Sequence, residues 1–124
     1  MRNVTVAAIQ MQCTTEVQKN IAKADEMLRK AASQGAQIIL LPELFERQYF
    51  CQERQYEYYA FAKSVYENDA VQHFKKVAKE LSVVIPVSFY EKDGNVLFNS
   101  VAVIDADGET VSYTHLTLPT ILLV

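Results

Sequence analysis

The chain has 124 residues, 50% of them hydrophobic, and carries a formal net charge of −3 from interspersed acidic and basic residues. This suffices for one compact domain, and the lack of a like-charged block argues against a nucleic-acid surface. With no apolar run of roughly 20 residues and a strand-like start instead of a signal peptide, we expect a cytoplasmic protein that binds no membrane. Cys13 and Cys51 lack metal-site or disulfide-framework spacing and are expected to be reduced, mostly buried thiols.

The first half of the sequence predicts a strand, a helix and a second strand. Residues 4–11 form a near-continuous apolar run rich in β-formers, which is typical of a strand covered on both faces. Helical spacing follows, with Thr14 or Thr15 as the expected N-cap and Gly35 just past the end. The apolar stripe of this helix is Val17, Ile21, Ala24, Leu28 and Ala31. Residues 36–42 then predict a second buried strand, parallel to the first.

The second half predicts one clear helix and a β-hairpin. Residues 53–66 are weakly helical, and their aromatic side chains are expected to pack: Tyr56, Tyr58, Tyr59, Phe61 and Tyr66. Residues 69–81 form an amphipathic helix with His73 as an ordinary surface histidine, on the side away from Val71, Phe74, Ala78 and Leu81. The turn sequence KDGN joins two strands, and a second Asp-Gly turn closes the later one. Strands so joined are antiparallel, which predicts an α/β fold with a mixed sheet.

Glu43 is the carboxylate whose position suits chemistry. It follows the buried strand of the segment IILLPELF, and reactive groups in open α/β sheets gather at the carboxyl ends of strands. Pro42 fixes the chain direction there, and a desolvated carboxylate would suit a general base. The competing interpretation is a loop charge that faces water. No glycine-rich phosphate loop, GxSxG elbow or HExxH helix is present, so nucleotide binding, serine-hydrolase and zinc-peptidase chemistry have no support.

The order of several motifs resembles the nitrilase, or carbon-nitrogen hydrolase, superfamily. These motifs, which span residues 3–109, are VAAIQMQC, GAQIILLPELF, YFCQ, VAKELSVVIPVSFYE and NSVAVIDADG. Within the superfamily they most resemble the N-carbamoylputrescine amidases. The resemblance implies that residues 1–110 are the N-terminal part of an α-β-β-α sandwich. It also implies hydrolysis of a small amide or carbamoyl-amine substrate, in this branch N-carbamoylputrescine to putrescine in polyamine synthesis, by a homo-oligomer without a metal or organic cofactor.

The superfamily's reaction uses a glutamate, a lysine and a cysteine. The cysteine attacks the carbonyl, the glutamate transfers protons and the lysine stabilises the oxyanion. The resemblance assigns the glutamate's role to Glu43. The lysine follows the Asp-Gly turn in the family, and the cysteine comes later still, but the last lysine or arginine here is Lys92 and neither cysteine matches the nucleophile's motif. We therefore predict that the chain as printed is inactive.

Residues 111–124 depart from the family, and their sequence has another explanation. The segment VSYTHLTLPT equals the translation of an adapter used in transposon-based sequencing libraries, codon by codon. We predict that residues 111–124 are a non-native tail. The competing interpretation is an ordinary apolar strand.

Two alternatives to the favoured function stay open. Within the superfamily, another branch such as an omega-amidase or a ureido-acid hydrolase would suit the same motifs. In a different class, the chain would be a complete, non-catalytic, flavodoxin-like binding module. Half of a sandwich exposes apolar sheet and should self-associate or bind hydrophobic dyes, whereas a complete module should unfold as a cooperative monomer.

Overall fold

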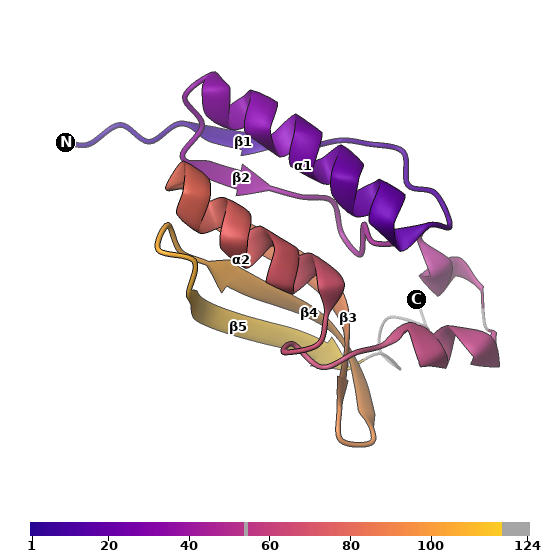
Figure 1. Cartoon of the computed structure of the whole chain (residues 1–124). Helices are drawn as coiled ribbons and strands as arrows, with labels where there is room; N and C mark the ends of the chain where they lie inside the picture. The colour runs from indigo at the N-terminus through magenta and orange to yellow at the C-terminus, as the bar shows by residue number, and fades with distance from the viewer. Residues whose placement is uncertain (54, 118–124) are drawn as a thin grey trace.

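The computed structural model describes residues 1–53 and 55–117, which form one layer of strands with both long helices on the same side (Figure 1). In chain order the elements are β1 (Val6–Ala8), α1 (Val17–Ser33), β2 (Ile38–Leu40), the 3-10 helices η1 (Phe50–Gln52) and η2 (Tyr56–Phe61), α2 (Asp69–Leu81), β3 (Ile85–Asp93), β4 (Val96–Ile104) and β5 (Thr110–Thr117). The predicted α/β class is confirmed.

The strands form two ladders, β1-β2 and β3-β4-β5. β1 and β2 are parallel, with Val6 opposite Ile38, while β3, β4 and β5 form an antiparallel ladder. The two ladders are joined where Ile39 N donates to the carbonyl of Val84 and Val84 N donates to the carbonyl of Gln37, both at 2.9 Å. The two-residue hairpin turn has Gly94 at a φ of 60°, a conformation that glycine adopts without strain.

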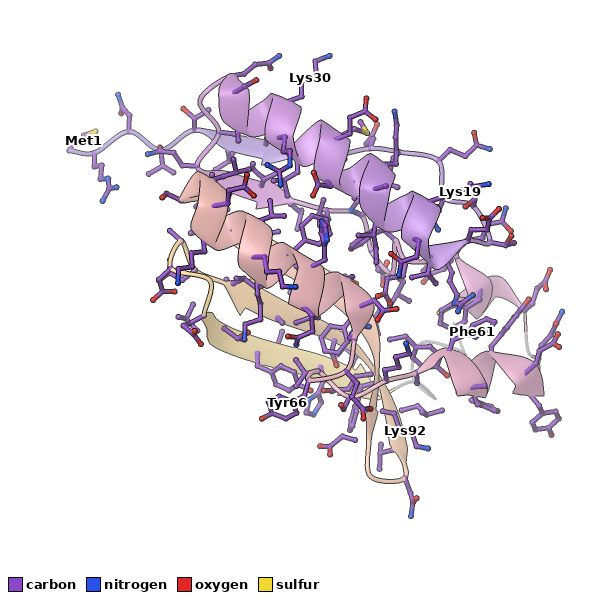
Figure 2. All side chains as sticks on the ribbon, in the orientation of Figure 1. Met1, Lys19, Lys30, Phe61, Tyr66 and Lys92 are labelled. Atoms are coloured by element: carbon purple, nitrogen blue, oxygen red, sulfur yellow. The ribbon has the colours of Figure 1, made fainter. Side chains whose placement is uncertain are left out.

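The main core lies between the sheet and the two helices. Alternate residues of β3 and β4 face the helices, and helical spacing turns one stripe of α1 and of α2 toward them. The largest fully buried apolar side chains of this core are Leu28, Ile39, Phe45, Val71, Phe74, Ile85, Val87, Phe89 and Ile104. Figure 2 shows Lys19 and Lys30 near opposite ends of α1, both directed away from the sheet. The helices therefore cover the helix-facing side of β2, β3 and most of β4, whereas Tyr113 on the same side of β5 is still 42% exposed.

The first two strands are shorter and less covered than the sequence predicted. β1 and β2 comprise three residues each, and the expectation of burial on both faces is wrong. Val6 is 68% exposed and Leu40 is 51% exposed, because both project from the face opposite the helices. Nothing in the described part of the chain covers that end of the face.

The helices match the prediction except at one cap. α2 has the predicted bounds and is capped by Asn68, whose Oδ1 accepts from Val71 N at 2.9 Å. Gly35 follows α1 at a φ of 96°, as expected of a C-terminal glycine. The predicted N-cap of α1 at Thr14 or Thr15 is wrong: the N-cap is Glu16, without a side-chain cap bond, and Thr14 instead stabilises the preceding turn by accepting from Glu16 N.

Two predictions about aromatic and histidine side chains need correction. Tyr56, Tyr59 and Tyr66 are 89%, 43% and 85% exposed, so the expected packing of residues 53–66 fails for them. Tyr58 and Phe61 do pack, in a second cluster with Leu44, Phe50, Ala62 and Tyr90 on the face opposite the helices. His73 is half-buried rather than an ordinary surface residue, because its Nε2 lies 2.6 Å from Asp25 Oδ2 on α1.

The C-terminal strand begins at the boundary where the sequence suggests a non-native tail. Residues 110–117 pair with β4 as an antiparallel edge strand, and residues 118–124 lie outside the described part of the chain. Ladder hydrogen bonds join backbone groups, so the pairing of β5 with β4 does not show whether the residues of β5 are native. The foreign origin of residues 111–124 thus stays a prediction.

Candidate functional site

Glu43 lies in a tight loop whose neighbouring residues are all anchored. The loop leaves β2 through Leu41 and Pro42 and crosses the end of the sheet. Leu44, only 3% exposed, adopts a φ of 50°, in the left-handed region that is strained for a non-glycine residue. Phe45 is fully buried against Phe74, with ring centroids 5.8 Å apart in an edge-on arrangement. The chain therefore turns sharply at Leu44, and the buried Leu44 and Phe45 fix the backbone next to Glu43.

Two side chains hold the backbone of this loop by hydrogen bonds. The hydroxyl of Ser88 on β3 accepts from Leu44 N at 3.0 Å, and Asn20 Nδ2 on α1 donates to the carbonyl of Glu46 at 2.8 Å. Ser88 and Asn20 are both buried, so these bonds are shielded from competing water. The loop is thus fixed both from the sheet and from the first helix.

The Glu46 side chain ties the same loop to α2. Its carboxylate accepts from Asn68 Nδ2 and from Ala70 N, each at 3.0 Å, at the N-terminus of that helix. Burial raises the pKa of Glu46, and this effect outweighs the lowering by the two hydrogen bonds. Glu46 therefore serves as an anchor, and its position inside the loop is set by packing rather than by access to a substrate.

Glu43 itself projects from the anchored loop onto the sheet face opposite the helices. The expectation of a desolvated side chain is wrong, because Glu43 is exposed. Its Oε1 accepts a short hydrogen bond of 2.6 Å from Asn99 Nδ2 on β4. Within the described part of the chain, Oε2 makes no hydrogen bond. One carboxylate oxygen is thus held by the sheet and the other can exchange a proton with a group brought to it.

Tyr49 and Cys51 lie close enough to Glu43 for its charge to act electrostatically on both side chains. Burial is the main cause that raises the pKa of the Cys51 thiol; a hydrogen bond from Tyr49 lowers it and the Glu43 charge raises it further. A thiol with a raised pKa stays protonated and is a poor nucleophile. Cys13, also half-buried, has its pKa raised by burial in the same way. Neither free cysteine of the chain has the environment of a reactive thiolate.

The strand register shows what faces the Glu43–Asn99 pair from β5. The residue directly opposite Asn99 is Leu116, which is 61% exposed. Leu116 carries no charge, so this neighbour cannot stabilise an anion beside Glu43. The site therefore contains an exposed carboxylate without a facing cation among the described residues of β5.

Two hollows of the described surface are not lined by Glu43. One cavity of about 580 Å³ lies on the helix side, beyond the start of α2; its lining includes Ser64, Gln72, Glu91, Lys92 and Tyr113. A second, of about 190 Å³, adjoins the loop after Glu43 and is lined by residues such as Arg47, Tyr49 and Tyr58. In residues 1–53 and 55–117, no group of three or more His, Cys, Asp or Glu side chains could hold a metal ion. No helix in that part is long and apolar enough to cross a membrane.

Sequence reasoning identified Glu43 but missed the residues that hold it. Ser88 and Asn99 are polar residues inside the apolar runs IPVSFY and VLFNSVAV, and both are less than 10% exposed. A polar side chain at a buried strand position is a signal that it has a partner, because an unsatisfied one would be costly. The sequence alone does not name that partner, which lies 56 positions away in the case of Asn99.

The fold is a mixed α/β layer in which a strand-end glutamate, Glu43, faces the side of the sheet that the helices leave uncovered. The profile of the family described as "Carbon-nitrogen hydrolase" matches residues 5–122, and the chain belongs to this family. It is similar to the N-carbamoylputrescine amidase of Solanum tuberosum, with 50% identity over 107 residues, which are 86% of this chain and 36% of the relative.

Further similarities support the family and the fold. The citrullinase of Francisella tularensis is 41% identical over 108 residues, covering 87% of this chain and 38% of the relative. The crystal structure of a carbon-nitrogen hydrolase from Helicobacter pylori G27 superimposes with a TM-score of 0.82 at 22% identity, covering 90% of this chain and 39% of that one. The chain therefore spans little more than a third of the length of these relatives.

Proposed function

We propose that this chain is the N-terminal third of an amidase that hydrolyses N-carbamoylputrescine to putrescine, and that Glu43 is its general base. The observation that carries the proposal is the placement of Glu43: an exposed carboxylate on an anchored loop, with one oxygen held at 2.6 Å by Asn99. The substrate follows from the relatives that share about half of this sequence, which are named N-carbamoylputrescine amidase.

In the proposed reaction Glu43 moves protons for a cysteine supplied by the rest of the enzyme. Its carboxylate takes the thiol proton as the sulfur attacks the carbamoyl carbon, and returns the proton to the departing nitrogen. It then takes a proton from the water that cleaves the resulting thiocarbamate and returns it to the departing sulfur. A nearby lysine stabilises the tetrahedral oxyanion. The lysine and the nucleophile are absent from this chain, because no lysine or arginine follows Lys92 and both cysteines lie before it.

The chain alone is therefore expected to release no ammonia from N-carbamoylputrescine above background. Removing the nucleophile of such a catalytic unit abolishes covalent catalysis, and what the remaining members contribute is small. The measurement is a coupled ammonia assay on the purified 124-residue chain. Turnover that disappears in Glu43→Gln would contradict the proposed division of the site between this chain and the missing part.

The substrate is tested in a hybrid enzyme. This consists of residues 1–109 joined in register to the part of the Solanum tuberosum relative that this chain does not match. We expect the hybrid enzyme to prefer N-carbamoylputrescine over citrulline, the substrate suggested by the second relative, and over a linear omega-amide. A preference for either competitor would replace the proposed substrate and retain the proposed chemistry, whereas a hybrid that folds and hydrolyses none of the three would contradict both.

A further inference from the structure

We propose that Asn99 is a positioning residue for Glu43: its amide fixes one carboxylate oxygen so that the other faces the reacting atoms. The inference rests on the proposed role of Glu43 as the base. The contact joins a β4 side chain to the loop after β2, and at 2.6 Å between Asn99 Nδ2 and Glu43 Oε1 it has the length of a charge-assisted hydrogen bond.

Asn99 is itself held in place by the most regular part of the sheet. It lies within β4, opposite Tyr90 of β3 and Leu116 of β5, and β3 and β4 pair without interruption from Ile85 to Asp93. Its side chain is 9% exposed, so few rotamers are open to it. Its amide therefore presents the N–H group from a fixed direction.

Glu43 lacks such internal restraint. An exposed glutamate can rotate about three side-chain bonds, and ordering it costs conformational entropy. The loop backbone is fixed by the bond between Leu44 N and Ser88, but that contact does not orient the Glu43 carboxylate. The Asn99 amide supplies this orientation, and a small misplacement of a proton-transfer group is costly to the rate.

A purely structural role for the bond explains less. Loop 43–47 already has anchors at Leu44, Phe45 and Glu46, and the Glu43 side chain fills no core space because it is exposed. Burying the polar Asn99 in a sheet face is unfavourable unless its amide has a partner. The hydrogen bond from Asn99 therefore orients the Glu43 carboxylate and contributes little to anchoring the loop.

Steady-state kinetics of the hybrid enzyme test the inference. Asn99→Asp keeps the shape of the side chain and replaces the donor by an acceptor, and we expect kcat to fall about a hundredfold with little change in KM. The matched control is Asn95→Asp in the exposed hairpin turn, which makes the same chemical change without a contact to Glu43 and should leave kcat unchanged. Equal kcat values for the two variants would overturn the proposed role.

A second measurement on the 124-residue chain does not depend on activity. In wild type, the Asn99 side-chain amide resonances should differ clearly from their positions in Glu43→Gln, whereas those of Asn95 should not. The double variant Asn99→Asp with Glu43→Gln swaps the donor and the acceptor across the same contact. It should recover the melting temperature that is lost in Asn99→Asp alone. The contact is refuted, even if the hybrid enzyme is active, when Glu43→Gln leaves the Asn99 amide resonances unchanged and the double variant does not recover the melting temperature. An intact contact in an inactive hybrid would instead count against the proposed function.

Discussion

The two faces of the sheet differ in how completely this chain covers them. On the helix side, Ile39 and Phe89 are 0% exposed beneath α1 and α2. On the opposite side, Val6 and Leu40 are more than half exposed, and only the loop after β2 with its aromatic cluster covers part of the surface. The helix side is a packed core over β2, β3 and β4, whereas the open face carries Glu43.

This difference indicates which face of the sheet would be covered by the two-thirds of the relatives' length that this chain does not match. A core that is complete on one side can form from local helical contacts and the strands beneath them. Apolar residues left exposed in a row mark a surface that another layer covers in the intact protein. Glu43 lies on that surface, so the chemistry proposed for it depends on the part that this chain lacks.

The largest expected effect contrasts one residue from each face. Phe89→Ala removes a fully buried ring from the helix side and should lower the free energy of unfolding by about 3–5 kcal/mol. Leu40→Ala, on the open face at 51% exposure, should cost less than about 1 kcal/mol. Urea unfolding of both variants measures the contrast. Similar losses would show that the open face is buried in solution, for example by self-association.

The next effect concerns the junction between the Glu43 loop and α2. Asn68→Ala removes both the N-cap acceptor for Val71 N and the donor to Glu46, and should cost about 2 kcal/mol or more. Thermal unfolding measures it, with Asn3→Ala in the exposed N-terminal segment as the control. A loss no larger than that of the control would mean that Asn68 does not join the loop to the helix.

Glu46 should make stability depend on pH in the opposite sense to an ordinary ion-paired carboxylate. Because burial raises its folded-state pKa above the usual 4.5, the folded chain binds this proton more tightly than the unfolded chain. The corresponding stability is present below pH 4.5 and is lost as pH rises through the raised pKa. In urea titrations, Glu46→Gln should remove this loss, while Glu67→Gln, an exposed control, should keep it. If the loss of stability with rising pH persists in Glu46→Gln, another titrating group causes it.

The smallest effect lies between the helices. Burial raises the pKa of Asp25, but hydrogen bonds and charges from Arg29 and His73 outweigh it, so the net pKa lies below 3.8. Its stabilisation is present above pH 3.8 and is lost as pH falls through the lowered pKa. Since Arg29 and His73 are each 39% exposed, we expect solvent to limit the contribution to less than about 1 kcal/mol. Acid unfolding of Asp25→Asn against Glu26→Gln, the exposed neighbour on α1, measures it; identical acid curves for these two variants would contradict the assignment.

The same two faces explain what the sequence could predict. Helical periodicity is a local property set by burial on one side, and it identified α2 from Asp69 to Leu81 correctly. The apolar run at residues 4–11 predicted cover on both faces, yet a sequence does not show whether the covering layer is in the same chain. In the described part of the chain, partners cover the run only on the helix side, and Val6 on the other side is 68% exposed.

The candidate site was predictable only in part, for a similar reason. Glu43 is marked by its position after a strand, a local signal, and the resemblance to a family gave it a role. Its contact with Asn99 depends on the register of a hairpin that lies far along the chain, which short-range patterns do not encode. The strain at Leu44 likewise results from anchors on β3 and α2 rather than from its own sequence.

The most direct test of the open face as the reacting face is the rate of ammonia release from N-carbamoylputrescine by the hybrid enzyme carrying Glu43→Gln. A general base contributes at least two to three orders of magnitude, so we predict a fall in kcat of about a thousandfold, with the exposed control Glu57→Gln close to wild type. If Glu43→Gln retained the wild-type rate, the carboxylate held by Asn99 would have no part in the reaction.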